Sequence, residues 1–477
     1  MMSKKQRLHP AAIFFTLLKT IKELVFSIGV IGFLAFKDAG LIYFLIGTSV
    51  LILAVVVFSA LSWYRYTYRL EEGELRIEYG ILIRKKRYIS KNRIQSIDLT
   101  QNIGHRIFKL VKVNIETAGS GVGTEASLKA VKLEMGEALR EELKTVQKPI
   151  ENDERNEGTN YNLPKQKITT KRLFLAGTTS GSIGILFVIM TFLFSELEQF
   201  IPDSYYENTF QTIISFSIII IAVLILALLL ILWLLGIAGT MIKFGKFTIT
   251  KNNEELFITR GLLEKKQTTI PIRRIQAVGI DESILRQPLG YVTVYAEVAG
   301  GTIEKGEDFS TILFPIMKKS EVDGFLNKFL PDYVSNRNDL IGLPENAKTF
   351  YIIRSTILLL IALIAMLFFI PQFIWVPTIL LLICLYMGLL RYKDAGFRID
   401  HEQLTLRYRV INRKTIILFH KRIQSFEKKQ HMIQKNASLA TIKTSIVSKF
   451  GTGKHYKIKD LAVEDIMELT SWYSYRD

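Results

Sequence analysis

The sequence predicts a multi-pass α-helical membrane protein that carries three β-rich modules on one side of the membrane, each ending in an α-helix. Three observations support this prediction. Long apolar segments alternate with segments rich in Lys and Arg, the mean hydropathy is positive although 22% of the 477 residues are charged, and one polar pattern occurs three times. Apolar and charged residues are therefore segregated along the chain.

Six apolar segments approach or exceed the roughly 20 residues that a helix needs to cross the hydrocarbon core of a bilayer. They are residues 13–35, 41–63, 173–195, 211–242, 355–370 and 374–390. Taken in pairs, they predict about six spans arranged as three hairpins, which cover residues 11–63, 171–242 and 350–390.

The first segment is the weakest of the six, because Lys19, Lys22 and Glu23 interrupt it. A charge at the centre of a bilayer costs about 2.5–3.5 kcal/mol on insertion scales. Two interpretations remain: residues 11–22 lie in the membrane interface as an amphipathic helix, or Lys19 and Glu23 pair at helical spacing inside a bundle. Because the second segment needs a partner to return the chain, we expect a spanning helix. We expect no cleaved signal peptide, since no small-residue cleavage site follows.

The short connections between paired segments predict the orientation. Residues 36–40 contain one Lys, residues 196–210 contain acidic residues without Lys or Arg, and residues 371–373 are uncharged. Nearly all of the 62 Lys and Arg therefore lie on the other side, and the Lys/Arg-rich side of a membrane protein is cytoplasmic. We expect a multi-pass protein of the cell membrane with both termini and all three polar regions inside.

The net charge of +18 is compatible with nucleic-acid binding, with contact to anionic lipid, or with the cytoplasmic loops of a membrane protein. The loop interpretation fits the expected spans best, and we expect no nucleic-acid partner. Cys384 is the single cysteine, so the chain can form neither an intrachain disulfide nor a cysteine-based metal site.

A repeated motif divides the polar regions into three copies of one module. The motif is Arg93-Ile94-Gln95-Ser96, then Arg274-Ile275-Gln276-Ala277, then Arg422-Ile423-Gln424-Ser425. The surrounding pattern stays in register over about thirty residues, which chance does not easily produce. Gly80 and Gly261 occupy one aligned position, where the third copy has Arg409.

Within each copy the hydrophobic pattern alternates with period two, which indicates half-buried strands, and a helical pattern follows at 134–146, 320–329 and 461–474. We therefore expect modules of several antiparallel strands and one helix. They cover residues 64–146, 243–330 and 391–474. The linkers 147–170 and 331–349 contain Pro, charged residues and Asn, and we expect them to be mobile rather than packed.

The helical hairpin, the strands, the Arg-Ile-Gln-Ser turn and the final helix resemble the bacterial pleckstrin-homology-like (PH-like) membrane module, type 2. Three such units, together with Leu8-His9-Pro10 and six spans, resemble the YdbT-type membrane protein family over nearly the whole chain. The resemblance implies a strongly bent sheet of about seven strands, a β-sandwich or barrel that the helix covers at one end. It supplies no catalytic residues, and some relatives are associated with protection against membrane-active peptides.

Motifs for enzymes, metals and cofactors are weak. Gly119–Thr124 and Gly451–Lys454 resemble phosphate-binding loops, but neither has the full Walker spacing, and strand-like segments follow where a helix is needed. The six histidines show no metal-ligand spacing, and no nucleophile elbow occurs. We expect no cofactor, no metal and no enzymatic activity.

Basic clusters recur at one position of the repeat, around the motif. They comprise Arg84, Lys85, Lys86, Arg87 and Arg93 in copy one, Lys265, Lys266, Arg273 and Arg274 in copy two, and Arg413, Lys414, Lys421 and Arg422 in copy three. Each Lys or Arg near an anionic membrane surface gains about 1 kcal/mol. We expect these residues to contact anionic phospholipid headgroups or a protein partner. The alternatives are a solvated loop and, for the motif arginines, a purely structural turn.

The sequence thus favours a membrane-anchored scaffold whose PH-like modules bind a membrane protein partner, anionic headgroups or each other. A transporter or exporter component is the alternative, in which Lys19, Lys22 and Glu23 would matter. A membrane enzyme with an unrecognised site is a second alternative.

Overall fold

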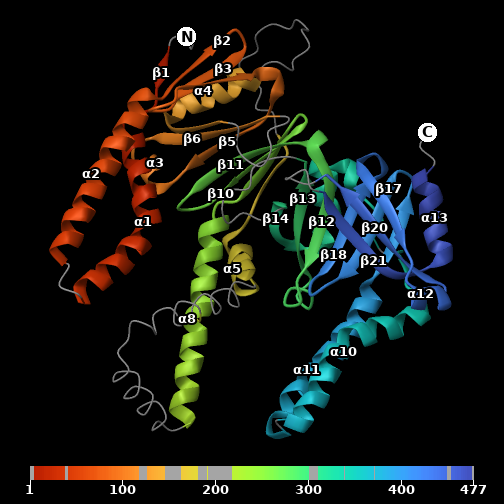
Figure 1. Ribbon diagram of the computed structural model, residues 1–477. Coiled ribbons are helices and arrows are strands. Elements are labelled where there is room, and N and C mark those ends of the chain that lie inside the picture. Colours follow the sequence, from red (N-terminus) through yellow and green to blue (C-terminus); the bar gives the residue numbers. More distant parts are fainter. Residues whose placement is uncertain are drawn as a thin grey trace, which may run out of the picture. The chain divides into compact units, whose positions relative to one another are not determined.

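A computed structural model describes residues 5–37, 41–117, 126–144, 163–180, 191, 218–299, 310–337, 339–369, 371–447 and 453–474. They divide into two compact units: Met1–Asn162 together with Leu263–Thr269, and Leu163–Leu262 together with Ile270–Asp477. The first unit contains module 1, and the second contains most of module 2 and all of module 3 (Figure 1). The glycine-rich stretch 119–124 and residues 451–452 lie outside the described residues.

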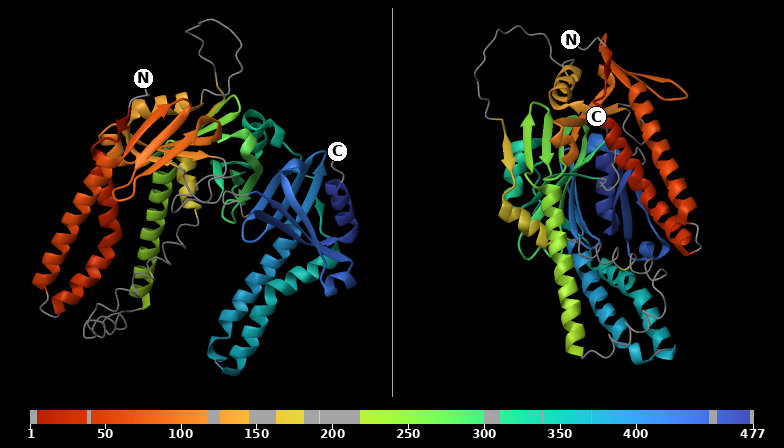
Figure 2. Two further views of the ribbon diagram at one scale, coloured as in Figure 1. Left: turned by 45° about the horizontal axis from the view of Figure 1, so that its top comes forward. Right: turned by 90° about the vertical axis from the view of Figure 1, so that its left-hand side faces the viewer.

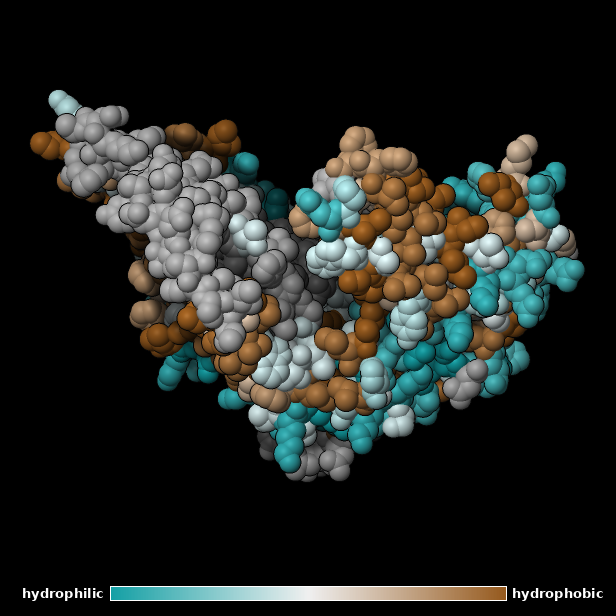
Figure 3. Space-filling model, turned by 90° about the horizontal axis from the view of Figure 1, so that it is seen from below, coloured by the Kyte–Doolittle hydropathy of each residue, from teal (hydrophilic) through white to brown (hydrophobic). Residues whose placement is uncertain are grey.

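A pair of helices leads into each module (Figure 2). They are α1 (Ala11–Lys37) with α2 (Leu41–Arg65), α5 (Thr170–Thr178) with α8 (Ile218–Phe244), and α10 (Glu345–Phe369) with α11 (Trp375–Asp394). Large apolar side chains on them are exposed, including Leu358 and Phe368 on α10 and Leu382 on α11. Figure 3 shows such apolar side chains gathered on one face. Exposed apolar helix surface of this kind suits contact with lipid.

Six spans are not confirmed. Within the described residues, four helices are long and apolar enough to cross a membrane: Ile42–Arg65, Ala222–Phe244, Glu345–Phe369 and Trp375–Asp394. The first expected span does form the helix α1, which carries Lys19, Lys22 and Glu23. Most of the third expected span, 173–195, lies outside the described residues, apart from α5 and the two residues after it, and Thr191.

The three modules repeat one order of strands. Module 1 contains β2 (Thr67–Glu71), β3 (Glu74–Tyr79), β4 (Lys85–Ser90), β5 (Ile94–Gln101), β6 (Leu110–Thr117) and β7 (Ala126–Lys132). Module 2 contains β9 (Thr248–Asn252), β10 (Glu255–Arg260), β11 (Lys265–Pro271), β12 (Ile275–Glu282), β13 (Tyr291–Val298) and β14 (Thr311–Lys318). Module 3 contains β16 (Gly396–Asp400), β17 (Gln403–Arg409), β18 (Arg413–Phe419), β19 (Ile423–Lys429), β20 (Leu439–Ile446) and β21 (Lys454–Ala462).

Each module ends in the helix that the sequence predicts: α4 (Leu133–Lys144), α9 (Val322–Phe329) and α13 (Val463–Ser474). The repeated motif marks a fixed local structure, because its arginine closes a short 3₁₀ turn and its isoleucine starts the next strand. These turns are Lys91–Arg93, Ile272–Arg274 and His420–Arg422. The turn connects the third strand of the module (β4, β11 or β18) to the fourth (β5, β12 or β19).

Where they are described, the segments before each hairpin pack against their modules, so residues 163–170, 331–337 and 339–349 do not fit the expectation of mobile linkers. Residues 147–162 of the first linker lie outside the described residues. The short strands β1 (Gln6–Arg7), β8 (Lys165–Lys167) and β15 (Ile341–Gly342) pair with β2, β9 and β16. Tyr333 is only 4% exposed, and its hydroxyl donates to the carbonyl of Ile275 (3.0 Å). The polar composition that suggested a linker instead fits an edge strand, which uses its backbone rather than apolar side chains. This seventh strand brings the number per module to that implied by the resemblance.

Each hairpin is fixed to its own module at one position of the repeat. The three residues there are His105 in helix α3 (Ile103–Ile107), Arg286, and Gln434 in helix α12 (Met432–Asn436). The His105 ring stacks on Phe15 of α1 at 4.0 Å, and Arg286 donates to the carbonyl of Ala176 in α5 (3.2 Å). Gln434 donates to Asp460, which also accepts from Arg354 of α10 (2.9 Å). The module is therefore in direct contact with the first helix of its hairpin.

Candidate functional site

Modules 2 and 3 are joined by a pair of strands. Strand β12 of module 2 lies antiparallel to β18 of module 3, from Ala277 opposite Leu418 to Glu282 opposite Arg413. One seven-stranded sheet, in the order β14-β13-β12-β18-β17-β16-β15, therefore runs through both modules (Figure 1). The apolar cores interlock as well, since Ile417 of module 3 is buried in the core of module 2.

The same two positions of the repeat pair a second time, within the first unit. Lys265, Lys266 and Gln267 of β11 lie opposite Gln101, Thr100 and Leu99 of β5. Arg140 of α4 donates to Gln267 (3.3 Å) and Thr269 (3.2 Å). In repeat positions, β5 corresponds to β12 and β11 corresponds to β18, and the two pairings have the same register. Strand pairing between successive modules is thus a repeated feature of the chain.

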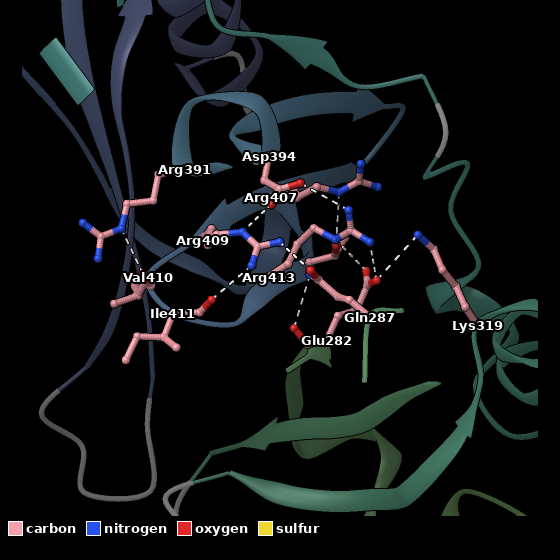
Figure 4. Close-up of polar contacts among 11 residues, drawn as sticks. Glu282, Gln287, Lys319, Arg391, Asp394, Arg407, Arg409, Val410, Ile411 and Arg413 are labelled. Atoms are coloured by element: carbon pink, nitrogen blue, oxygen red, sulfur yellow. Dashed lines mark hydrogen bonds and ion pairs between the residues drawn. The ribbon is translucent and has the colours of Figure 1, made fainter. Parts of the chain in front are cut away.

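A buried polar cluster fastens the junction of modules 2 and 3 (Figure 4). Arg413 of β18 donates to Glu282 of β12 and to Asp394 at the end of α11 (3.2 Å to the latter). Arg409 pairs with Asp394 and donates to Gln287 (2.8 Å). Glu282 and Arg409 are 4% and 6% exposed, so these charges are largely removed from water.

Opposite charges compensate one another in this cluster. Burial lowers the pKa of Arg413, but hydrogen bonds and charges from Glu282 and Asp394 outweigh that effect and raise the pKa above its ordinary value. Asp281 lies opposite Lys414 at 4.0 Å, and burial raises the pKa of its carboxyl despite that cation. Removing one member of such a buried ion pair strongly destabilises the folded protein, because the other charge stays buried without its partner.

The basic residues predicted as a ligand site have different surroundings in the three copies. Arg413 and Lys414 face acidic residues of module 2, and Lys265 and Lys266 lie in the strand paired with β5. The turn arginines Arg274 and Arg422 donate to the carbonyls of Ala299 and Arg273, while Lys421 lies over the ring of Phe419 at 5.4 Å. Arg273 lies inside the 3₁₀ turn Ile272–Arg274, and Arg93 closes the turn Lys91–Arg93.

The cluster in module 1 is different, because β4 is the last strand of the sheet β1-β2-β3-β4 among the strands described. Lys85, Lys86, Arg87 and Tyr88 are all exposed, whereas the corresponding part of β18 is mostly buried. Arg84 precedes β4 and pairs with Glu78. Of the three predicted clusters, this one presents the most accessible cationic surface.

A cavity of about 400 Å³ lies where the first hairpin meets module 1. Its walls include Phe58 and Trp63 of α2, Tyr66, Arg87 and Lys129. Burial lowers the pKa of Lys129, and the positive charges of Lys19 and Lys112 lower it further. The cavity thus combines aromatic and apolar walls with two basic side chains, a combination that suits an anionic amphiphile.

Sequence reasoning missed the acidic half of the junction. Asp281, Glu282 and Asp394 carry no motif. Asp281 and Glu282 contact Lys414 and Arg413 only after two modules come together, whereas Asp394 contacts Arg413 within the third repeat. The available signal was that Asp281 and Glu282 fall in the repeat where Thr100 and Gln101 stand in copy one. Within the part of the chain that the structure describes, no group of His, Cys, Asp and Glu is arranged to hold a metal ion.

Comparison with known proteins places this arrangement in a family. The model of the bacterial PH domain matches three times, over residues 16–147, 200–331 and 351–477. The chain belongs to the bacterial PH domain family. It is also 36% identical over 490 residues to the UPF0699 transmembrane protein YdbT of Bacillus subtilis (strain 168), an alignment that covers 100% of this chain and 99% of that protein. The resemblance to YdbT-type proteins with three PH-like modules is thereby confirmed.

The buried junction gives a first test. Replacing Glu282 by Ala removes one of the two carboxylate acceptors of Arg413 and leaves positive charge in excess at a buried site. We expect the variant to lose about 3 kcal/mol of unfolding free energy. Denaturant unfolding of the purified protein in detergent would measure it. The matched control is Glu254→Ala in an exposed turn, which should change stability by less than about 0.5 kcal/mol. Equal stability of the two variants would contradict a structural role for the cluster.

Proposed function

We propose that the chain is a membrane-anchored scaffold. Its helical hairpins hold three PH-like modules on the cytoplasmic side of the cell membrane, with both termini inside. The pairing of successive modules through the same strands, seen twice, carries this proposal. Modules joined in this way can offer one combined surface to partner proteins. The asymmetric distribution of Lys and Arg supports the cytoplasmic orientation of the modules.

The proposed role is binding without catalysis. A transporter would need ionisable groups that line a pathway through the spanning helices. The pair Lys19–Glu23 of α1 is separated by 3.9 Å, and both side chains are more than half exposed, at 75% and 60%. An exposed pair on one helix is weak support for a pathway. Protection against membrane-active peptides, with which some relatives are associated, is compatible with a scaffold whose partners lie in the same membrane.

The scaffold proposal predicts proteins captured at the modules in living cells. A photo-crosslinking amino acid placed in turn at exposed positions of all three modules, such as Glu137 on α4 and Lys428 on β19, should capture a defined protein. The buried position Leu404 is the control that should capture none. The capture should fall when Glu282→Ala weakens the junction. If no exposed module position captures a protein, the scaffold proposal fails.

A second candidate function is direct contact of the modules with lipid, and the β3–β4 loop of module 1 and the β17–β18 loop of module 3 favour it. Leu82 and Ile83 of the β3–β4 loop are 96% and 74% exposed, and Val410 and Ile411 of the β17–β18 loop are 58% and 61% exposed. These loops adjoin the second helix of their hairpins: Arg391 of α11 donates to the carbonyl of Val410 (2.9 Å), and Ile81 of the β3–β4 loop lines a cavity together with Phe58 of α2. Exposed apolar tips beside the end of a spanning helix are suited to enter the bilayer interface.

Quenching by lipid tests this candidate. In a Cys384→Ser background, a fluorophore attached to Ile83→Cys should be quenched strongly by lipids brominated in the acyl chain, because the tip enters the interface. The same fluorophore attached to Glu137→Cys on the exposed face of α4 should be quenched much less. Equal, weak quenching at both positions would show that the tip lies in water and would rule out this contact.

A further inference from the structure

Successive modules pair through edge strands of their sheets. Among the strands described, the first and the last module each keep one such edge strand that no other module joins. The pairs β5–β11 and β12–β18 each join the strand after the motif in one module to the strand before the motif in the next. At the beginning of the series, β4 is the corresponding strand before the motif. At its end, β19 is the corresponding strand after the motif, and it is the last strand of the sheet β19-β20-β21 among the strands described.

The basic residues of β4 do not by themselves prevent pairing at this edge. Lysines often protect an exposed strand edge from aggregation. However, β11 carries Lys265 and Lys266 and β18 carries Arg413 and Lys414 at the same repeat positions, and both strands are paired. In the second case the pairing strand supplies Asp281 and Glu282 directly opposite the two basic residues. The pair β12–β18 thus shows that a basic edge strand of this chain can pair with a strand that carries acidic residues.

The two edge strands at the ends of the series, β4 and β19, carry like charges. In the register of the existing pairs, Lys429 of β19 would lie opposite Lys85 of β4, and Lys428 would lie opposite Lys86. Like charges directly opposite one another destabilise a strand pair. A second copy of this chain, docking through β19, is therefore disfavoured as the occupant of β4.

We propose that the outer edge of β4 is a docking site for an extended acidic segment of a partner protein. The segment adds antiparallel to β4, with small or apolar residues opposite Arg87, Tyr88 and Ile89 and an acidic residue opposite Lys85. This is the arrangement in which Gly279, Val278, Ala277 and Asp281 of β12 meet β18. Main-chain hydrogen bonds supply affinity in such strand addition, and side-chain pairs supply specificity. The inference rests on the proposed scaffold function and names the chemistry of its partner.

The probe for this site is the chain's own acidic strand. A fluorescent octapeptide with the sequence of Ile275–Glu282 should bind the full-length protein in nanodiscs. Lys85→Glu should weaken its binding about tenfold, and the peptide with Asp281→Lys, the position opposite residue 85, should regain binding to that variant. Lys85 is exposed on an edge strand, so its substitution should leave the fold intact. Failure of the peptide to bind, or unchanged binding to Lys85→Glu, would overturn the proposal.

Disulfide trapping checks the register. In a Cys384→Ser background, a peptide with Cys at the Asp281 position should form a disulfide with Lys85→Cys, because directly opposed residues lie on the same face of a strand pair. The matched control is Lys86→Cys, whose side chain points to the opposite face. Equal trapping at both positions would contradict the register. Loss of the peptide site with proteins still captured at other module positions in cells would reject this inference and leave the scaffold proposal standing.

Discussion

The backbone groups at the edge of a β-sheet need hydrogen-bond partners, and this requirement organises the polar part of the molecule. The backbone groups of β12 and β18 pair with each other across the boundary between two modules. Those of Lys265–Gln267 in β11 pair with β5 in the same way. Each module therefore completes an edge of another one. The buried contact between Glu282 and Arg413 follows from this pairing, because the two groups belong to different modules, and Asp394 of the third repeat completes it.

The second constraint is the connection between each module and its helices. His105, Arg286 and Gln434 occupy one position of the repeat, yet they use ring stacking, hydrogen bonds to backbone carbonyls and an amide–carboxylate contact. The position is retained while its chemistry changes. Short strands from the preceding segment add to the same modules. Modules 2 and 3 are thus held both by the strand pair β12–β18 and by contacts with their own hairpins.

The strands, the final helices and the motif turns could be predicted from the sequence, because the hydrophobic period is a local signal and the pattern is repeated three times. The environment of the basic clusters could not. Lys85, Lys266 and Lys414 align, but the first lies on an exposed edge, the second opposite Thr100 and the third opposite Asp281. Those partners belong to other copies of the repeat, and one sequence does not reveal which edges meet. The packing of Tyr333 was missed for a similar reason, since its hydrogen-bond partner Ile275 is 58 positions away.

Hydrogen exchange of single amides tests the central claim most directly. An interior antiparallel strand has neighbours on both sides, so successive amides of Arg413–Leu418 should all be protected, with opening free energies near that of global unfolding. An edge strand is bonded on one side only, so β4 should show protection at alternate residues. Alternating protection in β18, with every second amide exchanging rapidly, would mean that β12 is not paired with it and would contradict the account.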